Sequence, residues 1–287
     1  MILVFRVSYH TVPGESQRLA FSLRDPISGL TMRQDVPMRW LDAEHWEAEI
    51  RVDAGNPVDI EYHYQYRDER NGALLDEWLA PRRASVNPAE HDAHVMLDDW
   101  RCAGTVDYAL ETKAFAPMLA ARGPYAAAAD APDATHRLSL HMAAVPAGMR
   151  PCVLGGAAAL GDWDWQRAIP LTETAPNHWE TRLILPADRA VEFKFGLHSA
   201  VEGTAVALEL GENRVLTPHT RGGRQLTDVR CEAYRRAPSG LPRGAGVAIP
   251  VFSLRGDARW ASASSPTLCL SPIGRPMPAS SSSRSCR

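Results

Sequence analysis

The feature that most constrains the fold of this chain is an internal repeat. Three segments of its first half recur in its second half, in the same order and at nearly constant spacing. They are EHWEAEI at 44–50 with NHWETRL at 177–183, EYHY at 61–64 with EFKF at 192–195, and EWLAPR at 77–82 with ELGENR at 209–214. Self-similarity of this kind indicates two copies of one structural unit.

Within each copy, apolar and polar residues alternate along the chain. Trp46, Ala48 and Ile50 alternate with Glu47 and Glu49, and similar alternation occurs in the second copy. A period of two is typical of strands with one buried face and one wet face. Short strands of this kind, punctuated by Pro, Gly, Asn and Asp, predict an all-β chain of two immunoglobulin-like antiparallel β-sandwich modules.

The repeat also predicts the domain organisation. The chain of 287 residues has room for two domains. We expect one sandwich at 1–103, a partly helical linker at 104–134 and a second sandwich at 135–232, followed by a disordered tail at 233–287. Apolar residues at helical spacing between 106 and 122 support the helical part of the linker. Its Ala-rich end is equally compatible with disorder.

Composition and charge exclude several classes of function. A net charge of −3 argues against nucleic acid or an anionic membrane as a partner, because both need concentrated Lys and Arg. The first residues, 1–6, lack the basic start and long apolar run of a signal peptide, so we expect a cytoplasmic protein. The five cysteines are odd in number and include no C-x-x-C, which disfavours a disulfide framework or a zinc site. We expect neither a metal nor a cofactor.

The second copy carries four motifs that point to a ligand. They are LGDWDW at 160–165, NHW at 177–179, EFKF at 192–195 and E-x-G-E-N-R at 209–214. Together these resemble the family 20 carbohydrate-binding modules, the starch-binding domains. The resemblance implies that Trp163 stacks on a glucose of an α-glucan, that Lys194 bonds its hydroxyls and that Asn213 assists. The chemistry is sensible, since an indole offers a flat apolar platform to a pyranose ring while amide and ammonium groups meet its hydroxyls.

Trp165 and Glu209 complete the candidate site, and one departure weakens it. The family usually has a second stacking Trp just before the Glu of its W-E motif, and Leu208 stands there. The lost stack costs on the order of 1 kcal/mol beyond lost area. Trp165 is a candidate to compensate, although packing would equally explain it. Lys194 lies between two Phe on a strand, so simple solvent exposure is its alternative explanation.

Other residues have structural explanations. Trp179 alternates with inward positions and is expected in the core, and Arg214 is expected to form an ion pair. The first copy lacks the L-G-x-W loop and has His63 where the second has Lys194. We therefore expect it to be mainly structural, with Trp78 as a residual contact.

The segment 241–255 resembles the opening strand of the catalytic barrel in 4-α-glucanotransferases of glycoside hydrolase family 77. In one branch of that family two starch-binding modules precede the barrel. Residues from 256 depart from the family pattern, and codons for 259–269 can be chosen so that another frame reads LGVGEFADL. We therefore hypothesise a frameshift near 256–259. A barrel takes about 250 residues, and no residue matches the family's catalytic carboxylates, so no catalytic residue is predicted.

The sequence thus predicts binding of starch- or glycogen-type α-glucan, or of maltooligosaccharides, by the non-catalytic part of a 4-α-glucanotransferase. Two alternatives remain open. One is retaining transfer of α-1,4-glucan, the activity of the relatives. The other is a sandwich used only for protein contacts, since this architecture hosts many functions. The oligomeric state is open as well.

Overall fold

The computed structural model describes residues 1–236, apart from gaps at 25–28, 30, 53–55, 104, 109–110, 112–115, 122, 127–130 and 144. The described residues belong to one compact unit, Met1–Ala237. The segment at 241–255 and almost all of the predicted tail lie outside them. Strands dominate the described part of the chain, so the predicted all-β class is confirmed. None of its helices is long and apolar enough to cross a membrane.

The first half of the chain forms the strands β1 (Ile2–Ser8), β2 (Glu15–Arg24), β3 (Thr31–Pro37), β4 (Arg39–Asp42), β5 (His45–Arg51), β6 (Val58–Asp68), β7 (Leu74–Asp76), β8 (Arg82–Val86) and β9 (Ala93–Asp99). The second half forms β10 (His136–His141), β11 (Met149–Gly155), β12 (Ile169–Pro170), β13 (Thr172–Ala175), β14 (His178–Leu183), β15 (Val191–Ser199), β16 (Thr204–Leu208), β17 (Arg214–Leu216) and β18 (Gln225–Cys231). Short helical turns are η1 (Val106–Tyr108), α1 (Ala116–Ala120), η2 (Ala158–Leu160) and η3 (Trp165–Arg167).

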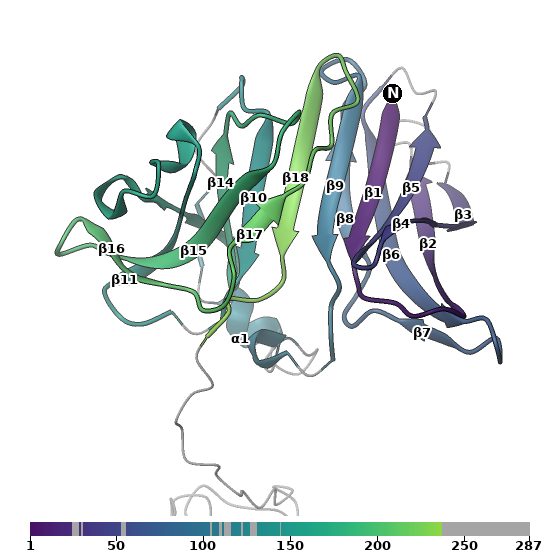
Figure 1. Cartoon of the computed structure of the whole chain (residues 1–287), viewed down its shortest axis with the longest axis horizontal. Coiled ribbons are helices and arrows are strands. Elements are labelled where there is room, and N and C mark those ends of the chain that lie inside the picture. The colour runs from purple at the N-terminus through teal and green to yellow at the C-terminus, as the bar shows by residue number, and fades with distance from the viewer. Residues whose placement is uncertain are drawn as a thin grey trace, which may run out of the picture. The chain divides into compact units, whose positions relative to one another are not determined.

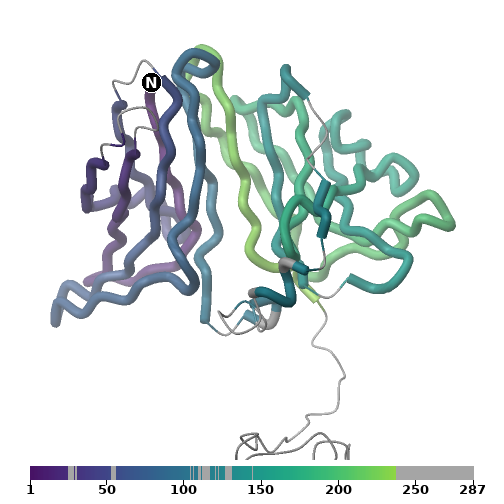
Figure 2. Tube along the Cα trace, turned by 180° about the vertical axis from the view of Figure 1, so that it is seen from behind, coloured from purple at the N-terminus to yellow at the C-terminus, as the bar shows by residue number. Residues whose placement is uncertain are grey.

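These strands form one large sheet and two smaller ones (Figure 1). The central sheet has eight strands in the order β13-β14-β10-β18-β9-β1-β5-β4. One smaller sheet, β3-β2-β6-β7 with β8 beside β6, belongs to the first half. The other, β12-β11-β15-β16 with β17 beside β15, belongs to the second half. The two halves therefore share the central sheet, which is continuous from one half to the other in both views (Figure 1 and Figure 2).

The halves meet where β9 and β18 pair in parallel, from Ala93 opposite Gln225 to Asp98 opposite Arg230. We call this pairing the seam. Met96 of β9 belongs to the first core, while its neighbour Leu97 packs against the second. Successive side chains of a strand point to opposite faces. The two smaller sheets therefore cover opposite faces of the central sheet, and a pseudo-two-fold axis runs along the strands at the seam.

Each half has its own apolar core, built from equivalent strands. Trp46 packs in the first core beside β1, and Trp179 packs against the second core beside β10. Trp179, expected in the core from its alternation, is partly buried at the margin of that core. Its indole nitrogen donates to the carbonyl of Met142 at 3.2 Å.

The repeated motifs at 77–82 and 209–214 form the same buried ion pair in each half. Arg82 Nη2 lies 2.7 Å from Glu77 Oε2, and Arg214 Nε lies 2.8 Å from Glu209 Oε1. In both halves the guanidinium also lies over an aromatic ring, 5.5 Å and 5.3 Å from its centroid. The ion pair predicted for Arg214 is therefore present, and this part of the repeat serves the fold.

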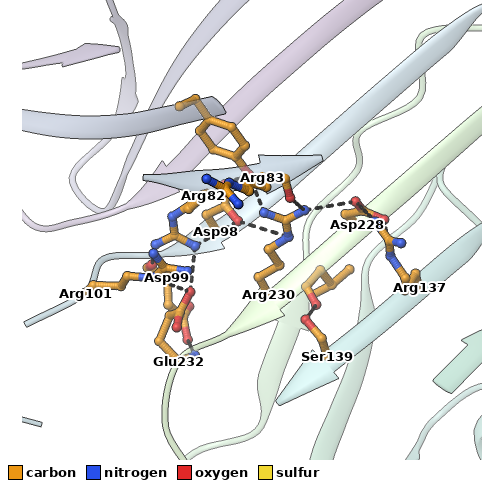
Figure 3. A network of polar contacts seen from close by, with 12 residues as sticks. Arg82, Arg83, Asp98, Asp99, Arg101, Arg137, Ser139, Asp228, Arg230 and Glu232 are labelled. Carbon is orange, nitrogen blue, oxygen red and sulfur yellow. Dashed lines mark hydrogen bonds and ion pairs between the residues drawn. The ribbon is translucent and has the colours of Figure 1, made fainter. Parts of the chain in front are cut away.

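Each of these arginines also reaches across the seam. Arg82 Nη1 lies 2.6 Å from Glu232 Oε1 (Figure 3). In the other half, Arg214 Nη1 lies 3.2 Å from Asp99 Oδ2. Burial alone would raise the pKa of Glu232, but Arg82 and Arg101 outweigh it and lower that pKa to about 2. The carboxylate is therefore charged at neutral pH. The two crossing ion pairs are equivalent under the pseudo-two-fold axis, and they fix one half against the other.

The segment between the halves is anchored at the seam. Among its described residues it forms only the turns η1 and α1, within the stretch predicted to be helical. Tyr108 of η1 donates its hydroxyl to Glu232 Oε2 at 2.6 Å. This contact places the start of the linker against the last strand of the second half. β9 ends at Asp99 and β10 begins at His136, and the linker boundaries at 104 and 134 stay a prediction.

Candidate functional site

The predicted binding loop leaves β11 at Gly155 and crosses the outer face of the smaller sheet of the second half. A Cβ atom at Gly155 would lie only 2.3 Å from the carbonyl oxygen of Glu192 on β15. No other residue fits there without moving the backbone. The loop then runs through η2 and η3 before it rejoins the sheet as β12.

The tip of this loop has an unusual backbone. Asp162 and Trp163 are consecutive and both left-handed, with φ of 51° and 63°. This conformation costs residues with a side chain about 1–2 kcal/mol each. Several hydrogen bonds hold it, among them one from the Trp163 amide to the Gly155 carbonyl at 3.0 Å and one from the Gln166 amide to the Asp164 carboxylate at 2.9 Å. Backbone strain of this kind concentrates at functional sites.

The indole of Trp163 is half-buried. It packs against a small apolar cluster on the outer face of the sheet, formed by Cys152, Leu154, Ala168 and Ala205. The cluster supports the ring, and the exposed remainder of the side chain is available to a ligand. This is the arrangement that a rigid stacking platform requires.

Lys194 lies next to this cluster. The register of β11 and β15 sets Leu154 directly opposite Lys194, which brings their side chains within about 5.5 Å on one face of the sheet. The Lys194 ammonium donates to the carbonyls of Gly211, at 2.6 Å, and of Glu209, at 3.4 Å. An ammonium has three protons, so one donor remains for a ligand.

Asn213 extends the same face towards β17. Its side-chain amide nitrogen donates to Glu192 Oε2 at 2.7 Å, and Glu192 lies two residues before Lys194 on β15. Residues two apart on a strand share a face. The carbonyl oxygen of the Asn213 side chain remains as an acceptor. Trp163, Lys194 and Asn213 thus lie on the same face of the smaller sheet, and their role in binding stays a prediction.

The other two predicted site residues differ from each other. Trp165 is 43% exposed on η3, in the same loop as Trp163. Glu209 is only 2% exposed, and its carboxylate accepts from the Phe195 amide and the Arg214 guanidinium. Its carboxylate faces inward, where it positions β15 and β17. No sugar reaches these oxygens without breaking the buried ion pair.

Leu208 takes the place of the second stacking Trp. A Cβ atom at Gly196 would lie 2.9 Å from Leu208 Cδ2, so the Leu208 side chain lies over β15 beside Lys194. It packs on the same apolar cluster as Trp163. The site therefore has one indole and one aliphatic patch where the resemblance implied two indoles.

The equivalent face of the first half is built differently. Its outer strand β3 pairs with β2, and His63 stands at the position of Lys194, with its Nε2 atom 3.6 Å from Asp76 Oδ1. Trp78 is 46% exposed, next to the buried Glu77. Among the described residues of this half, no aromatic loop crosses the sheet.

Two further aromatic residues escaped the sequence analysis. Tyr9 directly follows β1 and Trp100 directly follows β9, and their rings lie 4.6 Å apart between centroids. Both are half-buried beside the seam. An aromatic residue immediately after each of two neighbouring strands was the signal that could have indicated them. No cluster of three metal-ligating side chains occurs in the part of the chain that the structure describes.

Comparison with known proteins places one family on this site. Residues 137–227, which include Trp163, Lys194 and Asn213, match the family model described as starch binding domain (CBM_20). A stretch of 99 residues is 30% identical to a 6-phosphofructo-2-kinase/fructose-2,6-bisphosphatase of Arabidopsis thaliana. It covers 34% of this chain but 13% of that protein.

Solved structures of carbohydrate-binding modules are also similar to this chain. The family 20 module of a maltotetraose-forming amylase from Pseudomonas saccharophila matches with 20% identity and a TM-score of 0.28, over 33% of this chain and 97% of that one. A family 26 module from Eubacterium rectale matches with 10% identity and a TM-score of 0.25, over 83% of this chain and 99% of that one.

Proposed function

We propose that the outer face of the smaller sheet in the second half binds α-glucan of the starch or glycogen type. The observation that carries the proposal is the grouping of Trp163, Lys194 and Asn213 on this face, inside the segment that matches the starch-binding model. The strained loop supports it, because its backbone conformation holds the indole at the surface.

The chemistry suits a neutral sugar. The indole of Trp163 stacks on the C–H face of a glucose, while the free proton of the Lys194 ammonium and the free oxygen of the Asn213 amide meet hydroxyl groups. Leu208 adds apolar contact without stacking. Trp165, exposed in the same loop, is available as a second aromatic contact. We expect a modest affinity for glucan, because Trp163 is the one full stacking platform of the site.

Titration calorimetry with maltoheptaose tests this proposal. The wild-type chain is expected to bind, and Trp163→Ala is expected to weaken binding by roughly tenfold or more, since a stacked aromatic contact and its buried area are lost. Trp40→Ala is the matched control, because Trp40 is 57% exposed in the first half. It should bind as the wild type does. Unchanged binding in Trp163→Ala would contradict the site.

Absence of any glucan-induced shift in the melting temperature of the wild type would contradict the function itself. The sandwich would then serve protein contacts instead. Retention of the folded far-UV circular dichroism spectrum in both variants separates loss of the site from loss of the fold.

We also propose a finer assignment, in which these modules serve a cytoplasmic 4-α-glucanotransferase. Its support is the resemblance of 241–255 to the opening strand of that enzyme's barrel, a segment outside the described residues. This chain is expected to show no disproportionation of maltotriose, because no residue matches the catalytic carboxylates. Sequencing the DNA across codons 250–270 tests the frameshift, since codons that cannot encode the family pattern in another frame would exclude it.

A further inference from the structure

Two adjoining cavities run along the seam beside the proposed glucan site. One, of about 280 Å³, extends from Asn213 and Val215 to Ser8 and Glu44. The other, of about 350 Å³, extends from Ser8 to Trp100. The cavities share Ser8 and Glu44 among their lining residues, so they form one continuous depression, which we call the seam groove.

The walls of the seam groove come from different halves of the chain. Ser8, Tyr9 and Trp100 follow or end strands of the first half, whereas Asn213 and Val215 belong to the β17 edge of the second half. Neither half forms the groove alone. The ion pair between Arg214 and Asp99, and a hydrogen bond of 2.8 Å from Arg6 to Thr217, fix the distance between the walls.

The lining of the groove suits an uncharged, hydroxyl-rich ligand. Tyr9 and Trp100 provide half-buried aromatic surface, with ring planes tilted by 46°. Glu44 and Asp99 supply carboxylate acceptors, and Arg235 supplies guanidinium donors. Acidic and basic side chains both line the groove, so it does not concentrate the positive charge that a phosphate needs. Aromatic surface next to mixed donors and acceptors is what a sugar chain requires.

The groove continues the glucan site. Asn213 belongs to both, because it lines the groove and bonds Glu192 on the outer face of the sheet. Strands β11, β15 and β17 are neighbours, and adjacent strands lie about 4.8 Å apart. The path from the Trp163 cluster across Lys194 to Asn213 is therefore short, and it leads to the mouth of the groove.

We propose that an α-glucan chain held at Trp163 continues past Asn213 into the seam groove, so that both halves bind one chain. This inference rests on the proposed function and deepens it. The first half, which lacks a binding loop in its described residues, then contributes to recognition through Tyr9 and Trp100. The protein selects long glucans over short ones, because only a long chain reaches the second half of the path.

Binding of maltotriose and of a long linear maltooligosaccharide to the full chain tests this inference. The wild type is expected to bind the long chain at least roughly tenfold more tightly than maltotriose, from one added aromatic contact and its area. Val215→Glu narrows the mouth of the groove at a side chain that is 50% exposed, so it should fold normally. Trp100→Ala removes an aromatic wall of the groove. Each of these two single variants should lower the affinity for the long chain towards that for maltotriose, and each should leave maltotriose binding unchanged.

The failures of the two proposals are distinguishable. Binding of maltotriose without a long-chain advantage, or an advantage that survives Val215→Glu, would overturn the shared groove and leave the Trp163 site intact. Absence of binding of either sugar to the wild type, or maltotriose binding that survives Trp163→Ala, would contradict the proposed function instead.

Alkylation of Cys102 gives an independent readout. This cysteine is exposed and lines the groove, whereas Cys152 is buried in the apolar cluster under Trp163. Saturating long glucan should slow iodoacetamide labelling of the Cys102 peptide several-fold, measured by mass spectrometry, and saturating maltotriose should not. Equal labelling rates with and without long glucan would overturn the inference.

Discussion

The two halves of this chain share the arrangement of their strands and buried ion pairs, and they differ in the side chains on their outer faces. Both have the buried Glu–Arg pair of the repeated motif, the aromatic ring under its guanidinium and the ion pair across the seam. Only the second half, among the described residues, carries an aromatic loop over its outer sheet. Residues that hold the sheets together are therefore repeated, and residues that meet a ligand are not. Repetition in this sequence indicates structure more directly than function.

The largest expected difference between the halves lies in their repeated arginines. Arg82 bonds Glu77, Asp98 and Glu232, all with buried carboxylates, whereas Arg214 bonds the buried Glu209 and the more exposed Asp99. Removing one partner of a buried ion pair costs about 3–5 kcal/mol, because a charge is left uncompensated. Arg82→Ala should reach or exceed this loss in urea unfolding, and Arg214→Ala should lose less.

The matched measurement is the unfolding midpoint of both variants at pH 7, with the surface variant Arg83→Ala as control. Arg83 pairs with Glu61 at the surface, where an ion pair contributes at most about 1 kcal/mol. Equal losses for Arg82→Ala and Arg214→Ala would show that the additional buried carboxylates around Arg82 add nothing to the Glu–Arg pair that both halves share.

A buried histidine pair in the second half, with no counterpart at the equivalent position of the first half, predicts a pH dependence of stability. His136 Nε2 lies 3.0 Å from His219 Nε2, while Leu3 occupies the equivalent position on β1. Burial and the neighbouring His219 lower the pKa of His136 from 6.5 to about 4. Folding therefore favours the neutral ring. The contribution of the neutral His136 ring to the free energy of unfolding is fully present above about pH 6.5. It is lost as the pH falls towards 4, by up to about 3 kcal/mol.

The variant His136→Leu copies the first half and tests this contrast. Urea unfolding at pH 7.5 and pH 4.5 should show a smaller loss of stability on acidification in His136→Leu than in the wild type. An unchanged pH dependence would assign the acid sensitivity to other groups.

The missing second indole predicts a gain of function. Leu208→Trp adds a stacking surface beside Trp163 and should strengthen maltoheptaose binding by about fivefold, equivalent to about 1 kcal/mol. Asp76 is the corresponding position in the first half, just before Glu77. Asp76→Trp is expected to leave binding unchanged, because no aromatic loop lies beside it in the described residues. A gain from Asp76→Trp in calorimetry would reveal a second complete site.

The sequence predicted the sandwiches better than it predicted their junction. The alternation of apolar and polar residues predicted the strands that are buried on one face only, such as β5 and β6, because one-sided burial produces a period of two. The central strands β1 and β9 are buried on both faces, and their signal was a continuous apolar run, Ile2 to Phe5 and Val95 to Leu97. Such a run does not specify its partner, so the pairing of β9 with β18 was not predicted.

The candidate site shows the same limit. The motifs predicted a site of Trp163, Lys194 and Asn213, because each residue stands in a segment with its own local pattern. The motif did not reveal that the Glu209 carboxylate is turned inward, since burial depends on Arg214 and Phe195 arriving from neighbouring strands. Tyr9 and Trp100 are brought together by the parallel pairing of β1 and β9. No local pattern contains that information.

The smallest expected effect concerns one backbone position that the halves occupy with different residues. Leu79 has a φ of 75°, and its counterpart Gly211 has a φ of 82°. A left-handed conformation strains leucine but suits glycine. Leu79→Gly should therefore stabilise the chain by about 0.5–1 kcal/mol, since relief of about 1–2 kcal/mol outweighs the added freedom of the unfolded glycine. Gly211→Leu should destabilise it similarly, although a Cβ there would meet no atom within 4 Å.

Because the Gly211 carbonyl holds the Lys194 ammonium, Gly211→Leu should also weaken glucan binding slightly, whereas Leu79→Gly should not. Thermal unfolding and calorimetry of the two variants measure both effects, and a loss of stability in Leu79→Gly would mean that its side chain contributes more than its backbone costs.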